Sequence, residues 1–306
     1  MNRAAKELLA LDCAKTAKEI EDYIRKSVDE AKAPGVIMGL SGGVDSALVA
    51  VLAVRALGKD RVTAYFLHDK NSETDSLEKA RLMAGRLGME LKVGSIGDFM
   101  REREKNAPFF SWLSNMPPFM IPVISTLYYL VVGETPYITT LRKNEIRKSK
   151  FKKWIYDNIM DGVEMMFDGP CRQRRVVLEK IAKEKNLLIM GAGNKSEDMT
   201  GWFTIDGIDN MPCSPIGGLY KAQVIELASY LGVPNIVSKR TPSADVLKGA
   251  TDALALGMDY GKIDVILYGI ENKMSDSDMT KYGVTIPEIL RVRKIYDLSA
   301  WKRTAG

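Results

Sequence analysis

The stretch MGLSGGVDSALVAVLAVRALG, from Met38 to Gly58, joins an apolar run to a segment with helical spacing. The run GVIMGL at 35–40 predicts a short buried strand, and DSALVAVLAVRALG at 45–58 predicts a helix. Three small residues, Ser41 to Gly43, lie between them. A strand that leads directly into a helix presents unpaired backbone N–H groups, and the helix dipole adds positive potential there. The stretch therefore predicts a turn that binds an anion.

The side chains of this turn suit a phosphate accompanied by a divalent cation. Gly42 and Gly43 let the backbone approach phosphate oxygens without a Cβ in the way, and Ser41 and Ser46 add hydroxyl donors. Asp45 would repel a phosphate unless a cation lies between the two anions, which MgATP provides. The turn is neither the G-x-x-x-x-G-K-[ST] loop nor G-x-G-x-x-G. As a bare pattern, a Gly-Gly pair at the end of a strand is also common in simple turns.

The composition of the 306 residues is that of a globular protein, with 46% hydrophobic and 27% charged residues. The net charge of +5 suits phosphate-bearing ligands, but scattered lysines alone do not indicate a nucleic acid partner. Cys13, Cys171 and Cys213 are odd in number and far apart, which argues against a disulfide framework or a structural zinc site and for a reducing compartment. His68 is the one histidine, which argues against a multi-histidine metal site.

Predicted strands alternate with predicted helices along the chain. Further strands are expected at 61–67, 90–96 and 187–193, and further helices at 76–88, 173–186 and 219–232. This order predicts an α/β fold, with a doubly wound, mostly parallel sheet, helices on both faces, and ligands at the C-terminal ends of the strands. We expect a single domain over 1–306 that begins with a leading helix within 1–34. That segment contains acids throughout and lacks a signal-peptide core, so we expect a cytoplasmic protein.

Residues 107–153 are an apolar and then basic insertion in this pattern. The segment 107–133 carries no charge, but Pro108, Pro117, Pro118 and Pro122 break it into pieces too short to span a membrane. An uncharged segment of this kind covers a pocket or an oligomer interface more often than it crosses a bilayer. The basic run that follows predicts a solvated helix face, or a contact with phosphate, nucleic acid or lipid headgroups.

The sequence SGGVDS resembles the pyrophosphate-binding loop of the N-type ATP pyrophosphatases, also called the PP-loop superfamily. Four further motifs are similar in order and approximate spacing to those of the ammonia-dependent NAD synthetases within that superfamily: GAGNKSEDMTGWFT (191–204), PIGGLYKAQVIELASYLGVP (215–234), RTPSADVL (240–247) and LGMDYGKIDVIL (256–267). The resemblance covers residues 35–269. It implies an adenine nucleotide alpha hydrolase-like fold, adenylation of a substrate with MgATP and release of pyrophosphate, deamido-NAD and ammonia as co-substrates, and a homodimer.

The resemblance also implies roles for individual residues. Asp45 and Glu197 would hold Mg²⁺, and Lys195 would act with Asp45 in catalysis by stabilising charge on the phosphates. The ATP contacts would come from Gly39, Ser41, Gly42, Gly43, Asp45, Ser46, Arg172 and Thr204, and the substrate contacts from Trp202, Asp209, Lys221 and Ser243. Two alternatives stay open, because GNKSED also suits a helix cap and Lys221 also suits a helix surface.

Three departures from the family pattern fall in the half that would recognise deamido-NAD. In GWFTIDGIDN, Asp206 and Ile208 stand where the family has the Tyr and Asp of a Tyr-Gly-Asp group, although Asp209 is adjacent. Ala253 follows Asp252 where the family has an acidic pair, and FDGPCRQRR replaces a Gly-Asn motif. These changes leave room for a nucleotide-binding protein without turnover.

Cys171 supports a further alternative. It precedes the predicted helix at 173–186 and is surrounded by arginines, and positive charge at a helix N-terminus favours the thiolate. Its position is similar to that of a sulfur-donating cysteine in a sulfur transferase of the superfamily, so catalysis by Cys171 on an adenylated substrate is a second hypothesis. A small buried hydrophobic residue is the alternative for Cys171. His68 follows a predicted strand and points to the ligand-binding edge of the sheet.

Overall fold

The computed structural model describes residues 1–69, 75–142, 150–209, 211–238, 241–243 and 246–304. Its centre is a sheet of four parallel strands: β1 (Val36–Gly39), β2 (Val62–His68), β3 (Leu91–Ser95) and β4 (Leu188–Met190). Their spatial order is β3-β2-β1-β4. The chain thus builds outward from β1 to β3 and then returns to place β4 on the other side of β1, which confirms the predicted doubly wound, parallel topology. The switch point lies between β1 and β4, where ligands of such folds bind.

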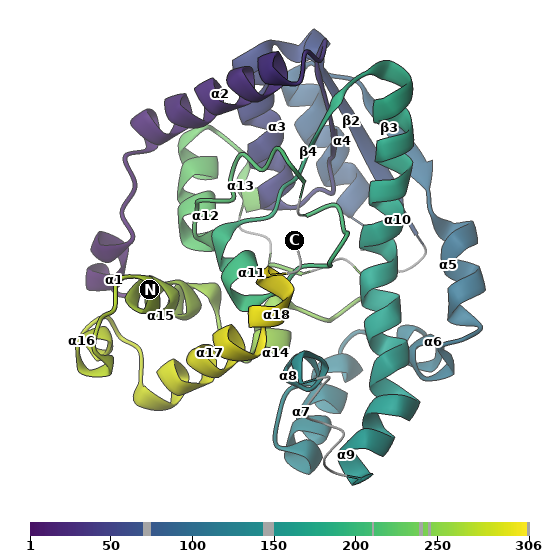
Figure 1. Cartoon of the computed structure of the whole chain (residues 1–306), viewed down its shortest axis with the longest axis vertical. Coiled ribbons are helices and arrows are strands. Elements are labelled where there is room, and N and C mark those ends of the chain that lie inside the picture. The colour runs from purple at the N-terminus through teal and green to yellow at the C-terminus, as the bar shows by residue number, and fades with distance from the viewer. Residues whose placement is uncertain (70–74, 143–149, 210, 239–240, 244–245, 305–306) are drawn as a thin grey trace.

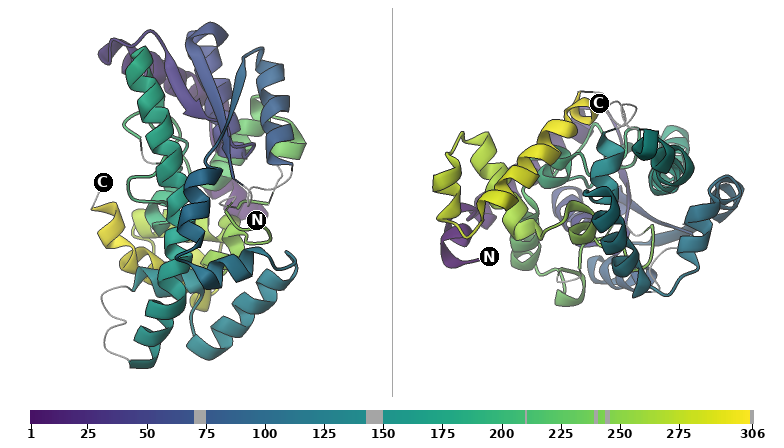
Figure 2. Two further views of the ribbon diagram at one scale, coloured as in Figure 1. Left: turned by 90° about the vertical axis from the view of Figure 1, so that its right-hand side faces the viewer. Right: turned by 90° about the horizontal axis from the view of Figure 1, so that it is seen from below.

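Helices cover both faces of this sheet. Helices α3 (Val44–Leu57) and α4 (Ser76–Leu87) connect the first three strands on one face, and α10 (Asp161–Lys185) precedes β4 on the other. Side chains along β1 alternate accordingly, since Met38 packs in the cluster of α3 while Ile37 packs in the cluster of α10. Figure 1 shows the sheet between these layers, and the left view of Figure 2 shows α10 along one side of the strands.

The remaining helices form the ends of the molecule. On the N-terminal side they are α1 (Arg3–Leu8) and α2 (Cys13–Glu30), with the short helical turn η1 (Lys59–Arg61) after α3. The middle of the chain adds α5 (Gly97–Glu104), α6 (Pro108–Ser114), α7 (Met120–Val132), α8 (Pro136–Leu141), α9 (Lys150–Ile155) and the wider turn η3 (Tyr156–Met160). The C-terminal third adds α11 (Lys195–Thr200), α12 (Lys221–Tyr230), α13 (Asn235–Ser238), α14 (Asp252–Leu256), α15 (Tyr260–Glu271), α16 (Asp276–Thr280), α17 (Ile286–Leu298) and α18 (Ala300–Arg303).

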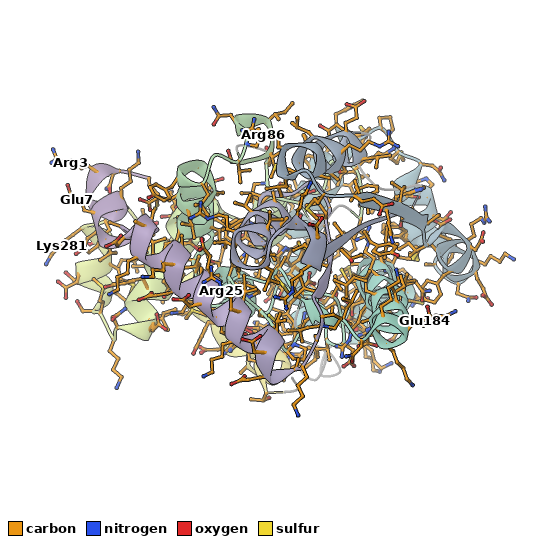
Figure 3. The ribbon with its side chains drawn as sticks, turned by 90° about the horizontal axis from the view of Figure 1, so that it is seen from above. Arg3, Glu7, Arg25, Arg86, Glu184 and Lys281 are labelled. Atoms are coloured by element: carbon orange, nitrogen blue, oxygen red, sulfur yellow. The ribbon has the colours of Figure 1, made fainter. Side chains whose placement is uncertain are left out.

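The predicted leading helix is two helices rather than one. The break falls between α1 and α2, where the side chain of Asp12 accepts a hydrogen bond from the Lys15 backbone and so caps α2 as a new helix. Ala5 of α1 packs with α15 and α17, whereas Ile24 of α2 packs on α3. Seen from above in Figure 3, α2 carries Arg25 across the molecule and α1 lies at its outer edge. The segment therefore ties the C-terminal helices to the sheet.

The uncharged segment folds as short helices at one end of the molecule. Pro108 begins α6, and α7 is 13 residues long. Among the described residues, no helix is both long and apolar enough to cross a membrane. Figure 1 places α6 to α9 below the sheet, and the view from below in Figure 2 shows them on the opposite side from α15 to α17. Residues 143–149 of the predicted basic run lie outside the described residues.

Candidate active site

A cavity of about 200 Å³ opens at the switch point, and we call it the switch-point cavity. Its walls come from the end of β1, the turn at 41–46, the end of β2, α10, and the segments that follow β4. Of the residues predicted from the sequence, the structure brings the following to its lining: Gly39, Ser41, Gly43, Asp45, Ser46, Cys171, Glu197, Trp202, Asp209, Lys221 and Ser243. Side chains from distant parts of the chain thus meet where the topology predicts a ligand.

Hydrogen bonds within the turn hold its backbone open towards the cavity. The Ser41 N–H donates to Ser46 Oγ at 3.1 Å, and Ser46 Oγ donates to the Gly43 carbonyl at 3.1 Å. Gly43 caps α3 and has no side chain to fill the N-terminus of that helix, while its own N–H donates to Ser41 Oγ at 3.3 Å. Gly42 has φ +80°, and a Cβ there would lie 2.4 Å from the Ser76 carbonyl oxygen. Only glycine fits this position, and the helix N-terminus that follows is suited to an anion.

Lys221 lies at the centre of the site. Its Nζ is 2.6 Å from Asp45 Oδ2 and 3.2 Å from Glu197 Oε1, and the residue is 2% exposed. The alternative of a surface lysine on α12 is therefore wrong. Asn194 Nδ2 donates to Asp45 Oδ1 at 3.0 Å, while Asn194 Oδ1 accepts from the Glu197 backbone at 3.1 Å. Asn194 thus caps α11, as the capping alternative predicts, and this cap also orients Asp45 and Glu197 towards each other.

A second layer of contacts fixes Lys221 from behind. Asp264 of α15 is fully buried and accepts hydrogen bonds from Ser196 Oγ at 2.5 Å and from the Ala222 backbone at 2.7 Å. Ser196 Oγ also accepts from the Lys221 backbone at 2.9 Å. Because these bonds join α11, α12 and α15, they hold the N-terminus of α12 and its lysine in place. Burial raises the pKa of Asp264 to about 7.

Several buried carboxyl groups surround the single ammonium group of Lys221. Burial, reinforced by Asp45, Asp252 and Asp209, raises the pKa of Glu197 to about 8 even though Lys221 opposes the shift. Burial alone would lower the pKa of Lys221, but Asp45 and Glu197 outweigh it and raise that pKa. Burial also raises the pKa values of Asp209 and Asp252. A site with this excess of buried carboxylates is suited to an additional cation.

The two central carboxylates fit a magnesium ion that is shared with phosphate. Asp45 and Glu197 converge on a single point, the Lys221 ammonium, and offer the hard oxygen ligands that Mg²⁺ prefers. Among the described residues, no group of three or more His, Cys, Asp or Glu side chains is placed to hold a metal on its own. Mg²⁺ commonly takes one or two carboxylates and completes its shell with substrate phosphates and water, and this donor set matches that pattern.

Lys195 lies outside the switch-point cavity. Its Nζ is 2.6 Å from Glu271 Oε2 and 4.8 Å from the centre of the Tyr220 ring. It is the first residue of α11, and its side chain leaves the helix towards α15, whereas Glu197 faces the turn at 41–46. The structure therefore does not bring Lys195 together with Asp45, and places Lys221 there instead. The catalytic role predicted for Lys195 stays a prediction.

Arg174, which the sequence analysis did not select, lines the switch-point cavity and donates from Nε to the Leu67 carbonyl at 3.0 Å. Asp252 also lines it, next to Lys221. The helical spacing of Cys171, Arg174 and Leu178 was the available signal for Arg174, because residues three and four apart share a helix face. His68 ends β2 at the expected edge, but its ring stacks near Phe66 and it is not among the described lining residues.

A second cavity, of about 380 Å³, adjoins the first, and we call it the insertion cavity. Helices α6, α7 and α8 form one wall, while α10, α14 and α18 and the segment after α11 form the others. Both cavities share Cys171, Trp202 and Asp209 in their linings. Arg172 and Thr204 line this second cavity, where both contact Asp168, and not the switch-point cavity with the turn.

Cys171 has surroundings that differ from those predicted. Helix α10 begins at Asp161 and continues through Pro170, so Cys171 lies in its interior and not at an N-terminus. Burial, with a contribution from Asp209, raises the pKa of its thiol to about 12 despite the nearby Arg174. The helix N-terminus that was expected to favour a thiolate is therefore not at Cys171. Cys171 lies at the junction of the two cavities, where its burial favours the neutral thiol.

The fold and the site define a class: doubly wound α/β proteins with a glycine turn at a helix N-terminus and paired carboxylates at the switch point. A model of the NAD synthase family matches residues 16–109 and 144–306. This match covers well over half of the chain, and the chain belongs to the NAD synthase family. The resemblance seen in the sequence motifs is thereby confirmed. The family model leaves residues 110–143 unmatched, and these residues contain α7, α8 and most of α6.

Curated relatives agree with this assignment. The NH(3)-dependent NAD(+) synthetase of Methanococcus aeolicus is 32% identical over 270 residues, which are 88% of each chain. The enzyme of the same name from Archaeoglobus fulgidus is 34% identical over 91% of this chain and 92% of its own.

Solved structures share the fold. An NMN synthetase from Francisella tularensis superposes with a TM-score of 0.66 at 22% identity, and an NH3-dependent NAD synthetase from Campylobacter jejuni with a TM-score of 0.64 at 24% identity. Each comparison covers 96% of both chains.

Proposed function

We propose that this protein is an ATP-dependent ligase that converts a carboxylate to an amide with ammonia, and that it makes NAD⁺ from deamido-NAD. Membership of the NAD synthase family and relatives named NH(3)-dependent NAD(+) synthetase support the reaction. The observation that carries the proposal is the convergence of Lys221, Asp45 and Glu197 beside the turn at 41–46. This arrangement joins an anion-binding helix N-terminus to a buried cation and a pair of carboxylates.

The reaction has two steps. In the first, a carboxylate oxygen of the acceptor attacks the α-phosphorus of ATP. A bond forms between them, the bond from the α-phosphorus to the oxygen that bridges to the β-phosphorus breaks, and pyrophosphate leaves. In the second, ammonia attacks the acyl carbon, the C–N bond forms, the C–O bond to AMP breaks, and a proton of ammonia passes to solvent. No electron is transferred to or from a redox partner.

The chain's own residues act by binding and by charge stabilisation. Backbone N–H groups of the turn and the hydroxyls of Ser41 and Ser46 hold the phosphate oxygens, and Lys221 neutralises charge that moves onto the departing pyrophosphate. Asp45 and Glu197 would hold Mg²⁺, which when bound neutralises the phosphate oxygens. Arg174 and Ser243 line the same cavity and would contact the nucleotide or acceptor. Positioning and electrostatics carry this chemistry with little need for a general base.

A homodimer and a cytoplasmic location remain proposals that rest on family resemblance and composition. Exposed apolar side chains on α7 support a contact between subunits, because Leu127, Leu130 and Val131 are 57%, 73% and 67% exposed. An analytical ultracentrifugation experiment tests this, and a monomer at micromolar concentration would count against it.

An assay of the complete reaction tests the proposed function. The protein is incubated with MgATP, ammonium and deamido-NAD, and both pyrophosphate and NAD⁺ are measured. We expect one pyrophosphate per NAD⁺, and loss of both in Asp45→Asn. Asp22→Asn, an exposed change on α2, is the matched control. Binding of ATP without release of pyrophosphate, with deamido-NAD and ammonium both saturating, would contradict the proposal and favour a nucleotide-binding protein without turnover.

A further inference from the structure

The carboxyl group of Asp252 has no role in the reaction steps described above. Asp252 is the first residue of α14, is 3% exposed and lines the switch-point cavity. Its Oδ2 atom accepts a hydrogen bond from the Tyr260 hydroxyl at 3.2 Å. Its Oδ1 atom is buried and has no hydrogen-bond partner within the part of the chain that the structure describes. Because a buried polar atom without a partner is costly, we expect a ligand to supply the missing donor.

Backbone contacts fix the position of this carboxyl group. The Thr251 side chain caps α14 by accepting a hydrogen bond from the Leu254 N–H at 3.2 Å. The Asp252 N–H donates to the Pro242 carbonyl at 3.0 Å, which ties the helix to another wall of the same cavity. Since Tyr260 holds the other oxygen, the carboxyl group cannot rotate without breaking a contact. The Oδ1 atom therefore has a fixed place in the cavity wall.

The cations of this cavity are engaged by other groups. Burial raises the pKa of Asp252, and the charge of Lys221 opposes that rise. The Lys221 ammonium, however, makes its ion pairs with Asp45 and Glu197, at 2.6 and 3.2 Å. Arg174 is hydrogen-bonded to the end of β2. The described lining contains four acids and two cations, namely Asp45, Glu197, Asp209, Asp252, Arg174 and Lys221. A further cation next to Asp252 would reduce this excess of buried negative charge.

The surroundings of Oδ1 favour a small cation that carries N–H donors. The atom is enclosed, so an ion can contact it only after losing water on that side. Mg²⁺ gives up water reluctantly and needs about six oxygen ligands, whereas an ammonium ion needs only hydrogen-bond acceptors. The side chains of Trp202 and Tyr260 both approach this carboxyl group, and aromatic rings attract ammonium groups. An ammonium ion thus matches the charge, the size and the hydrogen bonding of this position.

We propose that Asp252 binds the ammonium ion that provides the nucleophile, with Oδ1 accepting one of its N–H bonds. The inference deepens the proposed function and rests on it for the fate of the ion. Lys221 and the turn at 41–46, which we assign to the phosphates, line the same cavity, so the ion is held next to the acyl adenylate. The bound ion releases one proton to solvent, and the ammonia that is formed attacks the acyl carbon and displaces AMP, as described for the proposed function.

Thermal unfolding in two salts is the first test and requires no turnover. Ammonium chloride and tetramethylammonium chloride are compared at equal concentration, because the second cation has the same charge and no N–H donor. We expect ammonium to raise the unfolding temperature of wild type relative to tetramethylammonium, and Asp252→Asn to lose most of this difference. An equal response of wild type and Asp252→Asn overturns the inference.

The matched control for this test is Asp259→Asn, which makes the same change at a nearby exposed acid whose side chain forms no helix-capping hydrogen bond. It is expected to respond to the two salts like wild type. Asp252→Ala takes the place of Asp252→Asn should the latter fail to fold, because it removes the carboxyl group without leaving a buried amide.

Steady-state kinetics is the second test and separates the two proposals. Initial rates of NAD⁺ formation are measured while ammonium and MgATP are varied in turn, with deamido-NAD saturating. We expect Asp252→Asn to raise the KM for ammonium by about tenfold or more and to change the KM for ATP by no more than about twofold. An unchanged KM for ammonium, or an equal rise in both KM values, overturns the inference. Wild type that forms no NAD⁺ counts against the proposed function, whereas the unfolding measurement still decides the inference.

Discussion

The switch-point cavity and the insertion cavity share three lining residues, yet their chemistry differs. In the first, buried charges converge, with Lys221 between Asp45 and Glu197 beside an open helix N-terminus. In the second, most of the wall is apolar and the few charged groups are bonded within the protein. The first lies within the family match, and much of the second is built by unmatched residues. The first region has the groups that our proposal assigns to phosphate, and the second offers a mainly apolar surface beside it.

The removal of Lys221 is the largest perturbation of the first region. In Lys221→Met the transferring phosphates lose a cation, and Asp45 and Glu197 lose the ammonium that compensates them. We expect pyrophosphate release to fall by about 10²- to 10³-fold. Single-turnover release of pyrophosphate measures this, with circular dichroism to establish that the variant is folded.

The control for that change is Lys262→Met. It removes a lysine of α15 from a partly exposed ion pair with Glu288 of α17, and we expect it to keep wild-type turnover. Lys195→Met belongs in the same series. A larger loss in Lys195→Met than in Lys221→Met would mean that the resemblance, and not the geometry, identifies the lysine that acts on the phosphates.

The backbone of the turn is the next perturbation. Gly42→Ala forces an L-residue into φ +80° and sets its Cβ against the Ser76 carbonyl, so we expect about 1–3 kcal/mol of strain and weaker binding of MgATP. In Gly85→Ala, within α4, no atom lies within 4 Å of the new Cβ, and the change is expected to stabilise the protein by about 0.5–1 kcal/mol. Thermal unfolding and nucleotide titration measure both, and equal affinity in the two variants would exclude a role for the turn.

The role of Asp264, whose hydrogen bonds hold the helix N-terminus that carries Lys221, is tested by the pH dependence of stability. The pKa of Asp264 is raised from 3.8 to about 7 by burial, so the folded state binds more protons than the unfolded state between those values. Stability is then fully present below about pH 4 and is lost as pH rises towards 7, with a slope of at most about 1.4 kcal/mol per pH unit from this group. Denaturant unfolding measured across this pH range should show that the free energy of unfolding of Asp264→Asn falls less steeply with pH than that of wild type. A slope identical to that of wild type would show that Asp264 is ionised when folded.

The smallest expected signal comes from Cys171. In a protein with Cys13→Ser and Cys213→Ser, iodoacetamide reports on Cys171 alone. Since burial raises its pKa to about 12, the alkylation rate should be slow at neutral pH and keep rising through pH 10 without a plateau. A plateau below pH 8 would reveal a thiolate and restore the sulfur-transfer hypothesis.

Much of the fold was predictable because its signals are local. The apolar runs at 35–40 and 61–67, the helical spacing after Asp45 and the small residues of the turn each depend on neighbouring residues. The turn at Ser41 to Ser46, with Asp45 in it, could therefore be placed at the switch point from sequence alone.

The parts that could not be predicted depend on contacts between distant residues. Lys195 and Lys221 are both lysines at a helix N-terminus, and contacts with Glu271 on α15 and with the Tyr220 ring turn Lys195 away. The helix was predicted to begin at 173, but α10 begins at Asp161, twelve residues earlier, because Met166 and Leu178 pack on the same layer. The insertion cavity exists only once α7, α10 and α14 are assembled.

The central claim is that the turn holds the phosphates of ATP while Asp45 meets them through magnesium. A calorimetric titration of ATP into wild type and Asp45→Asn, each with and without Mg²⁺, tests this directly. We expect magnesium to tighten ATP binding by wild type by about tenfold or more, and Asp45→Asn to lose most of that gain. Equal tightening by magnesium in both proteins, or no uptake of ATP by wild type with Mg²⁺ present, would contradict the account.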